Sequence, residues 1–258
     1  MSTTSRPYRL RGLLAAGALS AAALTGCGGD GADDELRAGS DSTSAEASAK
    51  VYEERGTDLT SGLLAADAFA PDAVVTSVPP EQLERGAEES AALAEGAQVT
   101  PAECNAAVQK TQPDFADFEE VAAVSAVQET TVVVEMLIRG GPTEGAVDQL
   151  LDAAVRCPEV QVSSPEIGGE ITARFENLPA PDLGDGAAVV LYTTTMALPD
   201  GTQRSLPMLL GAVEDGDRLV FLTSLAADPD VAAAAPLDAA GFAALLEQAY
   251  ETQAAALD

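Results

Sequence analysis

The run of residues from 171 to 225 constrains the fold most, because apolar, β-branched stretches alternate there with turn signals. These stretches predict four strands, at residues 171–177, 187–198, 203–213 and 218–225. Asp-Gly turn sequences follow the second strand, at Asp200-Gly201, and the third, at Asp215-Gly216. Tight Asp-Gly turns join neighbouring antiparallel strands. This half of the chain therefore predicts an antiparallel meander, in which Pro207 marks an edge or a bulge.

Helices are predicted ahead of the meander. Short amphipathic helices are expected over residues 59–70 and 79–94, separated by proline breaks. Thr100 and Glu103 have the spacing of a capping box around Pro101, which predicts a helix that carries Cys104 in its first turn. That helix is expected to end near Lys110.

Two further strands and two further helices complete the pattern. Residues 119–127 and 129–138 predict either a hairpin or one long strand, since the break between them is weakly marked. A helix over residues 143–155 and a final helix over residues 238–256 follow from apolar residues at helical spacing. Their predicted buried faces are Val147, Leu150, Leu151, Ala154 and Val155, and then Phe242, Leu245, Leu246, Ala249 and Tyr250. This order predicts an α+β fold, a twisted and mainly antiparallel sheet with helices packed on it.

The amino terminus has the form of an export signal. Three arginines and no acidic residue precede a short run of Leu, Ala, Gly and Ser that ends at Leu24. About a dozen residues are too few to span a bilayer, which takes about 20. Leu24-Thr25-Gly26-Cys27 then resembles the lipobox of bacterial lipoproteins, in which the cysteine receives a diacylglyceryl group after the signal is removed. The alternative is an ordinary secretory signal with a cysteine there by chance.

This resemblance divides the chain into three parts. Residues 1–26 are expected to be a lipoprotein signal peptide, and residues 27–50 a flexible linker rich in Gly, Ser, Asp and Ala. Residues 51–258 form the predicted domain. Lipidation at Cys27 places that domain outside the cytoplasm and ties it to the cell membrane, because two or more acyl chains anchor a protein stably.

Two cysteines remain after Cys27 is assigned to lipid. An exported protein folds in an oxidising compartment, where Cys104 and Cys157 most simply form one structural disulfide. The alternative is a pair of free thiols for metal or redox chemistry, but the spacing is not Cys-x-x-Cys. The chain also contains no histidine.

The missing histidine and the charge balance exclude several classes of function. Without histidine the chain has no Ser–His–Asp or Cys–His catalytic group. The net charge is −29, and removing three arginines with the signal (13 − 3 basic against 42 acidic residues) makes it −32. Such a charge repels phosphate backbones, so nucleic acid is not expected as a partner. The sequence has no phosphate loop, dinucleotide fingerprint or Gly-x-Ser-x-Gly, and we expect no cofactor.

Acidic and aromatic residues offer two weaker alternatives. Calcium sites are conceivable at Asp182 with Asp185, Asp215 with Asp217, and Asp228 with Asp230, but these residues fit turns better and we expect no metal. A hydrolase with paired carboxylates stays open as a less favoured alternative. Some aromatic side chains are expected in the core or, alternatively, along a pocket for an apolar ligand: Tyr192, Phe221, Phe242 and Tyr250.

Several short stretches resemble the sensor-like domains of actinobacterial envelope lipoproteins and the extracellular sensor domain of the mycobacterial receptor kinase PknH. The stretches are LLAADAFAPDAVV (63–75), VTPAEC (99–104), RCP (156–158) and ENLPAPDLGD (176–185). The resemblance implies a twisted antiparallel sheet flanked by helices, with disulfides and a surface cleft that binds ligand. The kinase sensors have two disulfides, whereas this chain has cysteines for one. No ligand-binding residue follows from the resemblance.

These features together predict a non-catalytic, lipid-anchored envelope protein whose domain binds a small molecule, an envelope lipid or a protein partner. The alternative is a structural or assembly factor that docks on a larger envelope complex. An internal apolar pocket would favour ligand binding, and an exposed apolar patch would favour docking.

Overall fold

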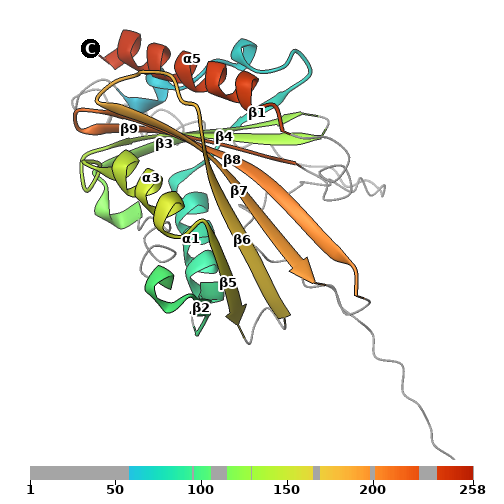
Figure 1. The fold of residues 1–258 in the computed structure, drawn as a ribbon. Coiled ribbons are helices and arrows are strands. Elements are labelled where there is room, and N and C mark those ends of the chain that lie inside the picture. The colour runs from blue at the N-terminus through green and yellow to red at the C-terminus, as the bar shows by residue number, and fades with distance from the viewer. Residues whose placement is uncertain are drawn as a thin grey trace, which may run out of the picture.

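The computed structural model describes residues 58–94, 96–105, 115–128, 130–164, 169–197, 201–226 and 237–257. Within these residues the chain forms one sheet of nine strands with helices on both faces, so the predicted α+β fold is confirmed (Figure 1). The strands are β1 (Val74–Ser77), β2 (Gln98–Thr100), β3 (Glu120–Gln128), β4 (Thr131–Arg139), β5 (Glu159–Ser164), β6 (Gly169–Leu178), β7 (Gly186–Ala197), β8 (Gln203–Asp215) and β9 (Arg218–Ala226). The helices are α1 (Pro80–Ala94), α3 (Ala146–Arg156) and α5 (Ala239–Leu257), and the 3-10 turns are η1 (Leu59–Gly62), η2 (Ala66–Ala68), η3 (Ala102–Cys104) and η4 (Phe115–Asp117).

The strands lie in the order β1-β3-β4-β9-β8-β7-β6-β5-β2, and every neighbouring pair is antiparallel. The predicted meander is confirmed as β6 to β9, and residues 120–139 form the hairpin of β3 and β4. At the β8–β9 turn Asp215 pairs with Arg218 and Gly216 has a φ of 61°, the left-handed conformation that two-residue hairpin turns need.

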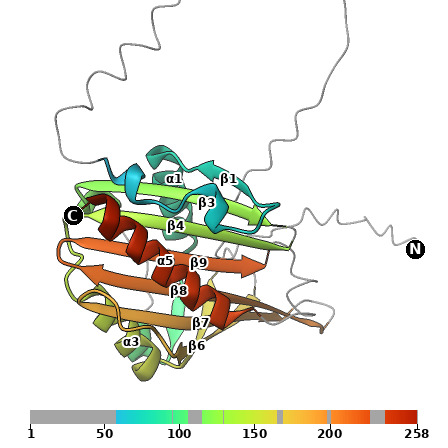
Figure 2. The same ribbon diagram turned by 90° about the horizontal axis from the view of Figure 1, so that it is seen from above.

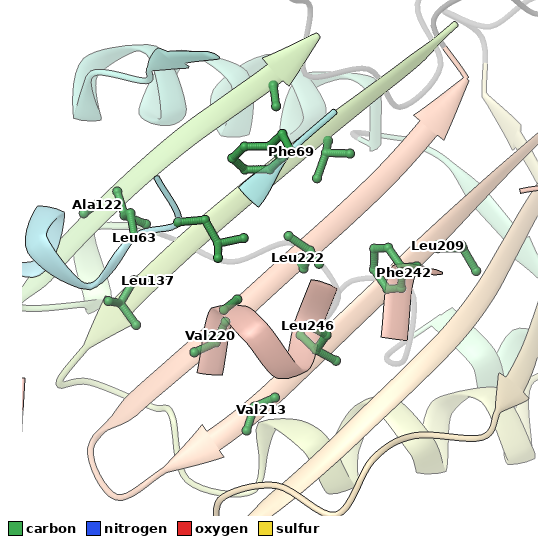
Figure 3. Close-up of a cluster of buried hydrophobic side chains, with 14 of the residues drawn as sticks. Leu63, Phe69, Ala122, Leu137, Leu209, Val213, Val220, Leu222, Phe242 and Leu246 are labelled. Atoms are coloured by element: carbon green, nitrogen blue, oxygen red, sulfur yellow. The ribbon is translucent and has the colours of Figure 1, made fainter. Parts of the chain in front are cut away.

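Helix α5 covers one face of the sheet, which we call the α5 face. Figure 2 shows α5 crossing β9 and β8 obliquely, with the segment that contains η1 and η2 beside it. Phe242 and Leu246 of α5 pack onto the strands in the largest buried cluster among the described residues (Figure 3). Gly211 of β8 lets the helix approach closely, because a Cβ there would lie 3.0 Å from both of these side chains.

The opposite face, which we call the α1–α3 face, carries three smaller buried clusters. Leu83 of α1 packs on β3 and β4, and Val147 of α3 packs on β7, β8 and β9. At the far end of the same face the half-cystines Cys104 and Cys157 pack on Val160 and Ala173. Figure 1 shows α1 and α3 on the side of the sheet opposite α5.

A side chain of the sheet holds the amino end of α3. The Glu214 carboxylate accepts hydrogen bonds from the backbone N–H groups of Gly145 (2.5 Å) and Val147 (3.0 Å). It satisfies two of the donors that a helix leaves free at its start and places a negative charge at the positive end of the helix dipole. The helix begins at Ala146, three residues later than predicted, and Val155 lies on its exposed side, outside the predicted buried face.

The prediction of a helix over residues 59–70 is wrong. The segment forms the 3-10 turns η1 and η2, and its apolar residues are buried by the sheet rather than by a helical face. Two carboxylates of the sheet bind its backbone, since Glu120 accepts from Leu59 N (3.2 Å) and Glu135 accepts from Leu64 N (2.9 Å). These long-range bonds replace the bonds that an α-helix would make within itself.

The predicted capping box at Thr100 is also wrong. Thr100 ends the edge strand β2, where it pairs with Gln161, and the turn η3 begins after Pro101 without a side-chain cap. Cys104 lies in η3, while the predicted extension of the helix to Lys110 lies outside the described residues. The strands β1, β2 and β5 were not predicted. The first two have four residues or fewer, and β5 pairs with β6, the next strand along the chain.

Pro207 was predicted to lie at an edge or a bulge, and it lies where β8 is paired on one side only. It pairs with Thr193 of β7, whereas pairing between β8 and β9 begins one residue later, at Met208. The missing N–H of Pro207 therefore costs no ladder bond between β8 and β9 in the described residues.

Candidate functional site

An unbroken row of apolar side chains crosses seven strands of the α1–α3 face. Directly paired residues of antiparallel strands point to the same face, so the register places the members of the row side by side. We call it the apolar row, and from β6 to β1 its members are Phe175, Tyr192, Met208, Leu225, Val132, Val127 and Val74. At about 4.8 Å between strands, six spacings give the row a length of roughly 29 Å.

The exposure of the row increases toward the edge of the sheet. The five members from β6 to β4 are half-buried, Val127 is 39% exposed and Val74 at the edge strand is 65% exposed. Val155 is the third exposed large apolar side chain among the described residues, and it stands apart on α3. Neighbouring exposed apolar side chains can belong to a binding surface, so the exposed end formed by Val127 and Val74 is the candidate entrance to the row.

An aromatic pair forms the inner end of the row. The rings of Phe175 and Tyr192 lie 4.9 Å apart between centroids, with 39° between their planes. Both pack against the cluster around the disulfide, which holds them in place. Burial raises the pKa of the Tyr192 phenol, so this end of the row is a low-dielectric environment for a neutral hydroxyl.

Thr223 adds a polar group beside the row. It lies on β9 two residues before Leu225, which puts both side chains on the same face. Its side chain is 5% exposed, and its Oγ1 has no hydrogen-bond partner among the described residues. A hydroxyl buried without a partner costs about 1–3 kcal/mol. The position thus combines an apolar surface with one unused hydrogen-bonding group.

A buried carboxyl group lies on the other face. Glu135 of β4 is 1% exposed, and burial raises its pKa to about 7, while the hydrogen bond from Leu64 N lowers it. Its direct partners on the neighbouring strands are Val124 and Leu222, which are apolar. Glu135 therefore holds the η1–η2 segment on the α5 face but does not share a surface with the apolar row.

The structure confirms the predicted disulfide between Cys104 and Cys157, with an S–S distance of 2.03 Å and 5.8 Å between the Cα atoms. The bond joins η3 to the end of α3 beside the inner end of the apolar row. Cys27, the predicted lipidation site, lies outside the described residues, as do the signal peptide over 1–26 and the linker over 27–50.

The acidic residues considered as calcium ligands have structural partners. Asp185 accepts from Gly216 N (2.8 Å), which ties the β6–β7 connection to the β8–β9 turn. Asp215 accepts from Arg218 and from Gln253 of α5. No group of three or more metal-ligating side chains occurs in the described part of the chain, and Asp228 and Asp230 lie outside it.

The four aromatic residues considered for a pocket do not come together. Phe242 and Tyr250 belong to α5 and its cluster on one face. Tyr192 and Phe221 belong to the α1–α3 face, so the sheet separates the two pairs. Phe242 is buried in the core, as the sequence predicted in preference to a pocket.

Sequence reasoning missed the apolar row and Thr223. The strands β6 to β9 were predicted, and alternation within each strand indicates which residues share a face. What was missing was the pairing of β9 with β4, which connects the meander to the hairpin, and the edge strand β1. Alignment of the strands by their turns would have placed Tyr192, Met208 and Leu225 together, since all three lie in the predicted meander.

No protein-family model matches the sequence. No curated protein matches it significantly either. Among solved structures, a similar chain is an uncharacterised protein from Mycobacterium smegmatis, the Rv0999 orthologue, with 17% sequence identity and a TM-score of 0.38. The alignment covers 74% of this chain and 90% of that chain. Among the helices of the described residues, none is long and apolar enough to cross a bilayer.

Proposed function

We propose that this protein is an extracytoplasmic lipoprotein, anchored to the cell membrane through Cys27, and that its domain binds an apolar, chain-like ligand along the apolar row. The proposal includes the sensor-like, non-catalytic role that the resemblance to envelope lipoproteins and to the PknH sensor implies. The observation that carries the binding role is the continuous row of seven apolar side chains, open to solvent at one end.

The shape of the row favours a linear ligand. It is one side chain wide and about 29 Å long, so an extended hydrocarbon chain would contact several members at once. Each buried CH₂ group contributes about 0.8 kcal/mol. A protein tethered to a membrane surface has lipid chains as the nearest ligands of this kind. No Lys or Arg belongs to the row, which favours an apolar contact over the capture of an anionic head group.

The sequence around Cys27 supports the anchor, and the disulfide supports export. A disulfide persists in oxidising compartments outside the cytoplasm, in agreement with export. In a fractionation experiment the wild-type protein should remain with the membranes, whereas Cys27→Ala should lose its diacylglyceryl mass and appear in the soluble fraction. Equal retention of both proteins in the membranes would show that Cys27 is not the anchor.

The binding role is tested on the full lipidated protein, purified from its own membrane in mild detergent. Native mass spectrometry of the wild type should show a bound apolar molecule, and Val127→Asp should lose most of it. Val155→Asp is the matched control, because it adds the same charge at an exposed valine outside the row. A wild-type spectrum without ligand, or equal loss in both variants, would contradict the proposal.

A second candidate is docking on a larger envelope complex. It is favoured by Val74 and Val127, whose exposed side chains stand next to each other at the β1 edge of the sheet. The same pair of variants separates the two candidates. If Val127→Asp releases a co-purified protein of defined mass and no small molecule is found, the row is a docking surface.

A further inference from the structure

We propose that Thr223 makes a hydrogen bond to the ligand of the apolar row, and that the ligand is therefore an uncharged amphipathic molecule, an apolar chain with a hydroxyl, ester or amide group. This inference rests on the proposed function of the row. It names the chemical class of the ligand and the residue that selects it.

The first argument is the position of Thr223 within the sheet. Its direct partners are Leu210 on β8 and Val134 on β4, and Leu210 in turn pairs with Val190. Thr223 is therefore part of the cross-strand row next to the apolar row, and Leu225 is its neighbour along the strand. A ligand lying on Leu225 and Met208 would therefore place a polar group beside the position of Thr223, two residues along β9.

The second argument is that the hydroxyl has nothing else to bind. Most buried polar side-chain atoms in folded proteins have a partner, yet Oγ1 of Thr223 has none in the described structure. The other unpartnered atom, Oε1 of Gln253, differs because its side chain is already anchored through Nε2 to Asp215, 2.7 Å away. Gln253 also belongs to α5, on the opposite face.

The third argument is the absence of a countercharge. Neither cross-strand row contains a Lys or Arg; the row of Thr223 consists of Asn177, Val190, Leu210, Thr223, Val134, Ser125 and Thr76. An ionised group buried at this place would have no partner in either row, which is unfavourable. A threonine hydroxyl both donates and accepts. A hydroxyl, ester or amide group of the ligand would therefore supply its missing hydrogen bond without bringing in a charge.

The test compares 1-dodecanol with dodecane, which differ by one hydroxyl group, on the full-length wild-type protein and on Thr223→Val and Thr223→Ser. The valine has nearly the shape of threonine without Oγ1, while the serine keeps the hydroxyl. We expect the wild type and Thr223→Ser to bind the alcohol about tenfold more tightly than the alkane. Thr223→Val should bind both probes equally.

The outcomes separate this inference from the proposed function. If both probes bind the wild type with the same affinity, the row binds apolar chains but Thr223 does not select them. If neither probe binds the wild type, the proposed function itself is overturned. A preference for the alcohol that survives in Thr223→Val also overturns the role of Thr223. If Thr223→Val does not fold, equal binding of the two probes by the wild type still overturns the inference.

Discussion

The two faces of the sheet differ in how they use apolar side chains. On the α5 face, one cluster of sixteen buried residues joins α5, the η1–η2 segment and five strands. On the α1–α3 face, the described residues form three separate clusters of four or five. The apolar row runs between and beyond these clusters, and most of it is only half-buried.

This difference indicates a division of roles. Burial of apolar area is the main favourable contribution to folding, so the α5 face supplies most of the stability. On the α1–α3 face part of the apolar area stays exposed to solvent, and ligand binding would bury it. A domain that is stabilised from one side in this way tolerates an incompletely covered surface on the other.

The largest expected effect comes from two leucines of the same strand. Leu222 is fully buried on the α5 face, and Leu225 is half-buried in the apolar row. Leu222→Ala should lower the free energy of unfolding by about 3–5 kcal/mol, because it leaves a cavity. Leu225→Ala should lower it by less than about 1.5 kcal/mol and mainly weaken ligand binding. Urea unfolding followed by circular dichroism measures both, and equal losses would contradict the division between the faces.

Removal of the disulfide should have an effect of comparable size. Its cysteines are 53 residues apart, and opening a loop of that length costs roughly 4 kcal/mol in the chain-entropy model. The double variant Cys104→Ala/Cys157→Ala should therefore unfold at lower urea concentration, and the aromatic pair beside the disulfide should lose near-ultraviolet circular dichroism. An unchanged midpoint would show that the inner end of the row is held by packing alone.

Glu135 makes the stability of the α5 face depend on pH. Its pKa in the folded protein is about 7, above the ordinary value of 4.5, so the fold favours the protonated form. The stability associated with this group is fully present below pH 4.5 and declines as pH rises through 7, by about 3 kcal/mol at most. Glu135→Gln keeps an oxygen for Leu64 N and should be more stable than the wild type at pH 8.

At pH 4 the free energies of unfolding of Glu135→Gln and the wild type should agree. Glu170→Gln is the control, because it removes the same charge from an exposed site on β6. If Glu135→Gln gives no gain at pH 8 relative to this control, the buried carboxyl is not the origin of the pH dependence.

The sequence predictions succeeded where the interactions are local along the chain and failed where they join distant segments. The meander and α5 depend on alternation, turn residues and helical spacing within short stretches, and both were found in the structure; of the two alternatives for residues 119–138, the structure has the hairpin. The segment 59–70 was mispredicted because its backbone bonds go to Glu120 and Glu135, more than 60 residues away. Thr100 was mispredicted for the same reason, since β2 exists only through its pairing with β5.

The sequence by itself determined the α+β class, the strands of the meander, the turn between β8 and β9 and the one pair of cysteines in the domain. These features follow from residue type and spacing, which act over a few positions along the chain. Only the tertiary structure decided which face each strand presents to α5, and that Val74, Val127 and Tyr192 belong to one row. The reason is that a row across a sheet is set by strand order and register, which depend on contacts between distant segments.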